Sequence, residues 1–93
     1  MENVTYVGGL FNDTYRVHEH IHKTYELVYY TMGTGHVRIG EENIDFSPGT
    51  ITLIAPEIPH TDFASGGFQN LYFHLLHPGM PIHSYVLVKD NEN

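Results

Sequence analysis

Glycine and proline recur at short intervals along this chain, and this spacing restricts the fold more than any other feature of the sequence. The 93 residues include nine glycines and five prolines. They occur at Gly8-Gly9, Gly33-Thr34-Gly35, Gly40, Ser47-Pro48-Gly49, Pro56, Pro59, Gly66-Gly67, Pro78-Gly79 and Pro81. Both residue types disfavour helix interiors and favour turns. Helices of ordinary length scarcely fit between them, so we predict an all-β fold.

The segments between these breaks are rich in Tyr, Val, Ile, Thr and Phe, which suit a pleated, half-buried surface. The predicted strands are 25–32, 36–39, 44–46, 50–54, 61–64, 68–76 and 84–88, with two more at 4–7 and 14–17. The short links at 33–35 and 41–43 predict tight turns between neighbouring antiparallel strands, which makes the middle of the chain a meander. Many short strands at this spacing indicate a sandwich or a barrel.

The length of the chain favours one domain, 1–93, with a single small core. Residues 1–13 are a candidate N-terminal arm, and 89–93 are expected to be a frayed polar tail. Hydrophobic residues make up 41% of the chain. Because so short a chain buries only a modest share of its surface, a homodimer is a natural expectation.

Charge and composition exclude several function classes. The formal net charge is −7 and no basic run occurs, so this chain alone is not expected to bind nucleic acid. The absence of Cys excludes disulfides and thiolate chemistry and favours a cytoplasmic location. No apolar stretch approaches the roughly 18 residues of a spanning helix, so no membrane association is expected.

Histidines are unusually frequent, with eight in the chain, and three of them alternate in one short segment. His18, His20 and His22 would point to one face of an extended strand. In a straight strand, His20 and Glu26 would lie about 20 Å apart, too far to bind one ion. The chain must therefore bend at Lys23-Thr24 if these residues cooperate, so that His20 and His22 end one strand and Glu26 begins the next.

A fourth ligand is available from His60, which follows Pro59 and opens a predicted strand. Three histidines and one carboxylate form a set that suits one divalent transition metal, either Zn, Fe, Mn, Ni or Cu. The candidate metal ligands are therefore His20, His22, Glu26 and His60. The alternative is a polar pocket lining that binds water or a ligand and holds no metal.

Two segments resemble the conserved motifs of the cupin superfamily. The run His20-x-His22-x3-Glu26-x6-Gly33 matches the ligands and spacing of the first cupin motif, although Thr14 stands in place of its initial Gly. The run from Gly49 to His60 resembles the second motif, but Ala55, Glu57 and Ala64 replace its usual Pro, Gly and Asn. This resemblance implies a double-stranded β-helix, or jelly-roll barrel, with the pocket inside.

A narrower resemblance covers roughly residues 14–77. The segments 22–29, 33–35, 46–49, 54–60 and 71–75 are similar to the N-terminal effector-binding domain of AraC-type transcription regulators. In that family the cupin barrel senses a small molecule, often helps to dimerise the protein, and precedes a helix-turn-helix domain. No segment here resembles that second domain, so the chain is either an excised sensor domain or a stand-alone cupin.

The resemblance implies a small-molecule effector, either a sugar or another small polar metabolite. It also implies a homodimer, and contact with DNA only through a helix-turn-helix domain that is not present in this chain. Effector binding would shift the population of arrangements of the arm or the subunit interface. The alternative is a stand-alone metal-dependent enzyme of the dioxygenase or isomerase type. We expect a sensor rather than an enzyme.

Other residues have both a structural and a functional interpretation. Tyr30 shares the face of Glu26 and either stacks on a ligand ring or fills the core. His74 lies in an apolar strand and is either a satisfied core histidine or a pocket contact. His18 is expected at the rim, and surface positions are expected for His36, Arg38, Glu57, His77 and His83. Tyr25, Leu27 and Tyr29 face outward, against a second sheet or another subunit.

Overall fold

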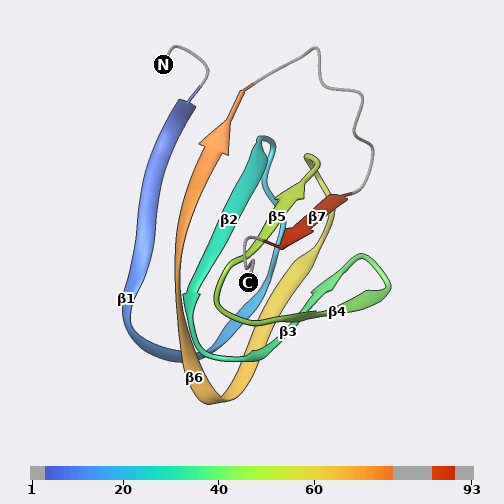
Figure 1. The fold of residues 1–93 in the computed structure, drawn as a ribbon. Helices are drawn as coiled ribbons and strands as arrows, with labels where there is room; N and C mark the ends of the chain where they lie inside the picture. Colours follow the sequence, from blue (N-terminus) through green and yellow to red (C-terminus); the bar gives the residue numbers. More distant parts are fainter. Residues whose placement is uncertain (1–3, 77–84, 90–93) are drawn as a thin grey trace.

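The chain folds as one curled antiparallel sheet (Figure 1). The computed structural model describes residues 4–76 and 85–89. Its strands are β1 (Val4–His20), β2 (Tyr25–Met32), β3 (Gly35–Ile39), β4 (Glu42–Phe46), β5 (Thr50–Ile54), β6 (His60–Leu75) and β7 (Tyr85–Lys89). This described part holds no helix, which confirms the all-β prediction. It accordingly holds no helix that is long and apolar enough to cross a membrane.

Strand propensity located most of the strands correctly. The predicted strands 25–32 and 50–54 coincide with β2 and β5, and the strands predicted at 36–39 and 44–46 are the C-terminal parts of β3 and β4. The strand predicted at 84–88 corresponds to β7, although residue 84 lies outside the described residues, as do 1–3 and 90–93. These agreements reflect local preferences for the pleated conformation.

The expected meander is correct only for β3 and β4, which are antiparallel neighbours joined by a tight turn, and wrong for β2 and β3. The strand order is β4-β3-β6-β2-β5-β7, so β6 lies between β2 and β3. The link at 33–34 therefore joins strands that are not neighbours. A Cβ on Gly33 would lie 2.2 Å from the Gly67 carbonyl oxygen, so this link passes directly against β6. Gly33 also has φ 93°, a conformation that glycine adopts without steric strain.

Two pairs of predicted strands are single strands in the structure. The segments 61–64 and 68–76 belong to β6, and 4–7 and 14–17 belong to β1. Gly66-Gly67 bends β6 instead of ending it, with Gly67 at φ 90°. The first part of β6 pairs with β3 and the later part with β2. Along one edge β6 thus pairs with two strands, β3 and β2, and along its other edge it pairs with β1.

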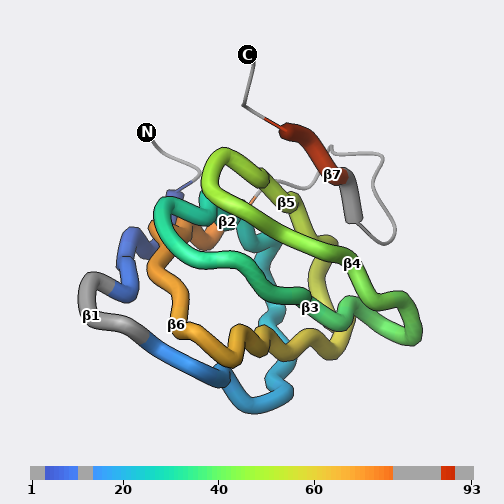
Figure 2. The backbone as a smooth tube through the Cα atoms, turned by 60° about the horizontal axis from the view of Figure 1, so that its bottom comes forward, coloured from blue at the N-terminus to red at the C-terminus, as the bar shows by residue number. Residues whose placement is uncertain are grey.

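The N-terminal segment pairs with β6 from Val4 onward. Val7 lies opposite Phe73, Leu10 lies opposite Asn70, and the register shifts between Leu10 and Thr14. In Figure 2 the tube shows β1 and β6 running side by side around one side of the sheet. The proposal that residues 1–13 act as an arm remains a prediction, and these pairings are the contacts that such an arm would have to break.

The curled sheet encloses an aromatic and aliphatic core. Its buried members are Val28, Tyr30, Val37, Ile39, Phe46, Ile54, Ala64 and Phe68. The Tyr30 ring stacks on Phe46 with centroids 4.0 Å apart and an interplanar angle of 10°. Phe68 meets Phe46 edge to face, at a centroid distance of 5.3 Å. This cluster fills one part of the interior and forms a wall of the pocket described next.

Candidate functional site

The interior of the sheet contains a cavity of about 200 Å³. All six residues predicted as ligand contacts line it: His20, His22, Glu26, Tyr30, His60 and His74. Apolar side chains complete part of the wall, among them Leu10, Val17, Val28 and Ile54. A small cavity with a few convergent polar groups in an apolar wall is typical of a small-molecule site.

Strand ends and strand pairing bring the four candidate metal ligands together. His20 ends β1 and lies opposite His60, the first residue of β6. Glu26 lies near the start of β2, and the chain bends between the two strands. The bend occupies residues 21–24. His22 lies within this bend, whereas the sequence predicts it at the end of the preceding strand. A residue outside a strand is free of the pleat, so His22 can turn toward Glu26.

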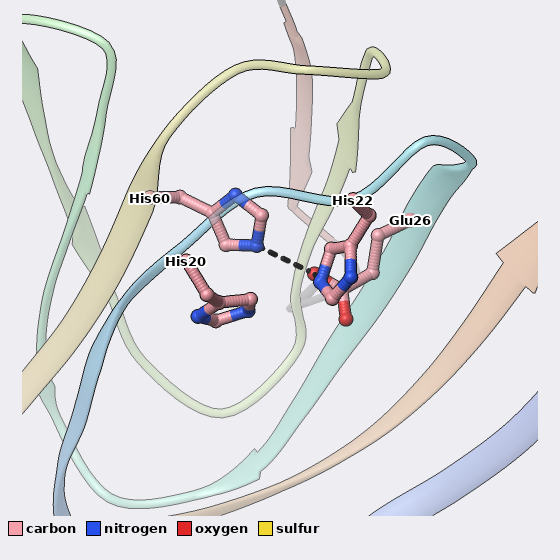
Figure 3. Close-up of side chains that lie close together, drawn as sticks. All are labelled: His20, His22, Glu26 and His60. Carbon is pink, nitrogen blue, oxygen red and sulfur yellow. Dashed lines mark hydrogen bonds and ion pairs between the residues drawn. The ribbon is translucent and has the colours of Figure 1, made fainter.

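The ligand atoms of these four residues converge. One atom from each of His20, His22, Glu26 and His60 lies within 4.8 Å of every other. His60 Nε2 lies 2.9 Å from Glu26 Oε1, and His22 Nε2 lies 3.6 Å from the same oxygen. Figure 3 shows the three imidazoles and the carboxylate gathered at the point where β1, β2 and β6 meet. Glu26 and His60 are buried, whereas His20 and His22 are half-buried.

Backbone carbonyls orient two of the imidazoles. His20 Nδ1 donates to the His18 carbonyl at 2.8 Å, and His60 Nδ1 donates to the Ile58 carbonyl at 2.9 Å. A carbonyl oxygen only accepts, so Nδ1 carries the proton in both rings. This leaves Nε2 as the atom directed at the cluster. Such a bond from the second ring nitrogen is the usual way in which proteins fix metal-binding histidines.

The cluster also shifts the pKa values of its members. Burial raises the pKa of Glu26, but the hydrogen bond and charge of His60, the charge of His22 and the hydrogen bond of His74 together bring it below its ordinary value. Burial lowers the pKa of His60, but its bonds to Glu26 and to the Ile58 carbonyl raise it above the ordinary value. Without metal, this hydrogen bond therefore favours an imidazolium at His60 and a carboxylate at Glu26.

His22 differs from His60 in the direction of its pKa shift and in the hydrogen bonding of its Nε2 atom. Burial lowers the pKa of His22, and the opposing effect of Glu26 is smaller. Its Nε2 is buried and makes no hydrogen bond with any residue that the structure describes. A buried polar atom without a partner is costly. A neutral imidazole nitrogen directed at a carboxylate and two further imidazoles is a suitable ligand for a divalent transition metal, so the donor set fits such an ion.

His74 and Tyr30 reach the cavity by different routes. His74 Nε2 lies 3.1 Å from Glu26 Oε2, so His74 is a pocket contact and also a hydrogen-bonded neighbour of the cluster. Tyr30 is fully buried, and its hydroxyl donates to Asp62 Oδ1 at 3.2 Å. Phe46 covers one face of the Tyr30 ring, so this face is closed to any ligand.

Sequence reasoning missed four polar or aromatic residues that line the cavity: Tyr6, Asp62, Asn70 and Tyr72. Asp62 and Asn70 are buried, and burial raises the pKa of Asp62 to about 6. Asn70 Oδ1 is buried and has no hydrogen-bond partner among the described residues. A signal existed for Asp62, which lies two residues after His60 and therefore on the same face. Tyr6 could only be found by knowing that β1 pairs with β6.

The remaining predicted positions that the structure describes lie on the surface. His18, His36, Arg38 and Glu57 are exposed, as expected. His18 contributes to the site only through its carbonyl, which accepts from His20. His77 and His83 lie outside the described residues. The side chains of His18, His36, Arg38 and Glu57 do not join the cluster of converging ligand atoms found in the described part of the chain.

Comparison with known proteins provides a family assignment. The sequence model of the AraC-like ligand binding domain matches residues 10–82 of this chain. No curated protein sequence matches the chain. The match to this family model includes the residues that line the cavity, except Tyr6.

Solved structures with similar backbones identify the fold. A conserved protein of unknown function from Streptococcus pyogenes has a TM-score of 0.64 and 20% identity, over 78% of this chain and 63% of that chain. A cupin protein from Bacteroides fragilis has a TM-score of 0.61 and 20% identity, over 84% of this chain and 69% of that chain. The predicted cupin jelly roll is thereby confirmed. This chain spans less than two thirds of the length of the streptococcal protein.

A third similar structure is the oxalate decarboxylase of Bacillus subtilis, a protein with Mn(II) centres. Its TM-score is 0.62 and its identity 17%, over 85% of this chain and 23% of that chain. At such identities the likeness establishes the shared fold and nothing about the reaction.

Proposed function

Because this chain belongs to the AraC-like ligand binding domain family, we propose that its function is to bind a small polar effector in the cavity of the jelly roll. The observation that carries this proposal is the convergence of His20, His22, Glu26 and His60 on the wall of the cavity. Burying so many polar groups is costly unless they gain partners. A bound molecule or ion supplies them.

We further propose that the four converging residues hold one divalent transition metal. The metal would act as a Lewis acid that binds oxygen atoms of the effector. The donors suit Zn, Fe, Mn, Ni or Cu, since imidazole favours these ions over Mg or Ca. The protein contributes the orientation of His20 and His60, which the carbonyls of His18 and Ile58 support.

The size and lining of the cavity favour a sugar or another small polar metabolite. Its volume of about 200 Å³ suits a small ligand. Asn70 Oδ1 offers an acceptor without a partner among the described residues, which suits a ligand hydroxyl. Tyr72 and Tyr6 add aromatic surface at the wall, with ring centroids 6.0 Å apart. Hydroxyl-bearing molecules with one apolar face match this combination.

The outer face of the sheet supports a homodimer. Cross-strand partners share a face, and the face opposite to Glu26 carries a continuous apolar surface. Its members are Val7, Leu27, Tyr29, Ile51, Leu53, Leu71, Phe73 and Val88. None of these side chains is charged. Two copies of a chain with a net charge of −7 avoid mutual repulsion best through such a surface, so we propose that a second copy covers it.

Within a regulator, the domain would pass its occupancy to a helix-turn-helix domain outside this chain. An effector that binds one arrangement of the arm or the dimer more tightly shifts the population toward it. The protein would then act in the cytoplasm, where its DNA target lies, and this chain would contact DNA only through that second domain.

The alternative function is a metal-dependent cupin enzyme of the dioxygenase or isomerase type. The same four converging residues favour it, since a metal with open coordination positions supports such reactions. The similarity to oxalate decarboxylase concerns the fold and does not favour this alternative over a sensor. Turnover of a bound ligand separates the two functions.

Thermal unfolding of the purified chain tests effector binding. The chain is loaded with Co²⁺ or treated with chelator, then mixed with pentoses, hexoses and small hydroxy acids. A true effector at 100 times its Kd stabilises the folded state by about 2.7 kcal/mol. Glu26→Gln should abolish this shift, whereas His36→Ala, an exposed position on β3, should retain it. A shift that survives Glu26→Gln contradicts the proposed site, and chemical conversion of the ligand indicates the enzyme.

A further inference from the structure

We infer that His74 is a positioning residue that holds the Glu26 carboxylate in place for the metal. This inference rests on the metal site proposed above and adds a residue that is not itself one of the four ligands. His74 lines the cavity beside the cluster, but its ring nitrogens are not among the ligand atoms that converge within 4.8 Å.

The two oxygens of Glu26 have separate partners. Oε1 lies 2.9 Å from His60 Nε2 and 3.6 Å from His22 Nε2, inside the cluster. Oε2 lies 3.1 Å from His74 Nε2, outside it. A metal that displaces the proton between His60 and Oε1 leaves the contact between Oε2 and His74 in place. The imidazole N–H of His74 can therefore hold the carboxylate both with and without the ion.

Strand pairing fixes His74 in this position. Glu26 lies directly opposite His74 in the β2–β6 ladder, and Tyr6 lies opposite His74 in the β1–β6 ladder. Directly opposite side chains on one face stand about 5 Å apart at Cβ. Tyr6, His74 and Glu26 thus form one row across three strands. The backbone of His74 is paired on both sides, so it cannot shift away from the Glu26 carboxylate without breaking the sheet.

Ring contacts further restrict the His74 side chain. Its centroid lies 5.4 Å from that of Tyr6 and 5.7 Å from that of Tyr72. It also lies 4.4 Å from the ring centroid of His22. Three rings therefore surround the imidazole, and a side chain packed in this way keeps its rotamer. Hydrogen-bond partners of metal ligands that are held in this manner commonly tune metal affinity.

Cobalt titration of the intact chain tests this role, because visible absorption reports both affinity and coordination. His74→Phe keeps a ring of similar shape but removes the N–H donor, and His74→Gln restores a donor. We expect His74→Phe to weaken Co²⁺ binding by about 10- to 100-fold at unchanged one-to-one stoichiometry. His74→Gln should recover much of this loss. His36→Ala on β3 should bind Co²⁺ as the unmodified chain does.

A double-mutant cycle with Glu26→Gln isolates the contact. If His74 acts through Glu26, His74→Phe should have little further effect on Co²⁺ affinity once the carboxylate is gone. Full additivity of the two substitutions would overturn the inference. So would unchanged affinity in His74→Phe, or a change of the absorption bands that marks the loss of a direct ligand. If His74→Phe does not fold, His74→Ala, which also lacks the N–H donor, takes its place and the same criteria apply.

The experiment separates this inference from the proposed metal site. Absence of Co²⁺ binding by the unmodified chain would overturn both. Binding that His22→Ala abolishes but His74→Phe leaves unchanged would support the four-residue site and overturn the role of His74 alone.

Discussion

His60 Nε2 lies 2.9 Å from Glu26 Oε1, although the two residues are 34 positions apart in the chain. The other nitrogen of His60 donates to the Ile58 carbonyl, so both nitrogens of the ring carry protons when no metal is bound. The pair is therefore held as an imidazolium and a carboxylate. A metal would compete with the proton on His60 Nε2, so metal binding is expected to depend on pH.

The first prediction concerns metal content. Purified, tag-free protein is expected to contain close to one transition-metal ion per chain, since four ligands converge. His22→Ala and His60→Ala should each remove the metal, and His36→Ala should leave it in place. Elemental analysis measures this directly. Metal-free protein that stays folded and resists reconstitution with metal would contradict the metal site. The cavity would then bind its effector without a metal.

The second prediction concerns the pH dependence of metal binding. Because the pKa of His60 is raised, this residue keeps its proton to a higher pH than a free imidazole does. That proton must leave when the metal binds. Below the pKa of His60, Co²⁺ affinity is thus expected to rise about tenfold per pH unit from this single proton. Isothermal calorimetry in buffers of different ionisation enthalpy counts the released protons, and pH-independent binding without proton release would exclude this arrangement.

The third prediction concerns Asp62 and stability without metal. Burial raises the pKa of Asp62 from 3.8 to about 6 in the folded protein. A raised pKa means that the folded state binds the proton more tightly, so this contribution to stability is complete below pH 3.8 and is lost as the pH rises to about 6. At pH 8, Asp62→Asn should therefore stabilise the chelator-treated protein, by on the order of 2 kcal/mol.

Urea unfolding of both proteins at pH 4 and pH 8 measures this difference. The advantage of Asp62→Asn should shrink toward pH 4, where the aspartic acid is also neutral. Asn keeps an acceptor for the Tyr30 hydroxyl, which bonds Asp62 in the unmodified chain. An equal difference in unfolding free energy at both pH values would show that Asp62 is not the titrating group.

The fourth prediction compares two glycines in strands. A Cβ on Gly35 would lie 2.2 Å from the Phe63 carbonyl oxygen, whereas a Cβ on Gly66 would meet nothing within 4 Å. Gly35→Ala is expected to destabilise the fold by about 1–3 kcal/mol because backbone must move. Gly66→Ala should change stability by no more than about 0.5 kcal/mol. Thermal unfolding measures this difference, and Gly35→Ala should have the lower Tm. Equal Tm values for the two variants would contradict the close approach of β3 and β6.

The strands could be predicted because their causes are local. The runs of β-branched and aromatic residues in β2 and β5 favour the pleated conformation wherever they occur. The pairing of β6 could not be predicted in this way. Gly66-Gly67 has the composition of a turn, and only contacts with β3, β2 and β1 keep it within one continuous strand. The sequence therefore suggested two strands and a meander where the structure has one bent strand between β2 and β3.

The candidate site likewise contains residues that the sequence predicts and residues that only the fold brings together. Residue identity and spacing were enough to identify the donors His20, His22, Glu26 and His60, and to show that the chain must bend for them to meet. The fold was needed to show that His74 bonds the second oxygen of Glu26 and that Asp62, Asn70 and Tyr6 line the same cavity. The physical reason is that ladder register between distant strands depends on the closure of the whole sheet, which no short segment encodes.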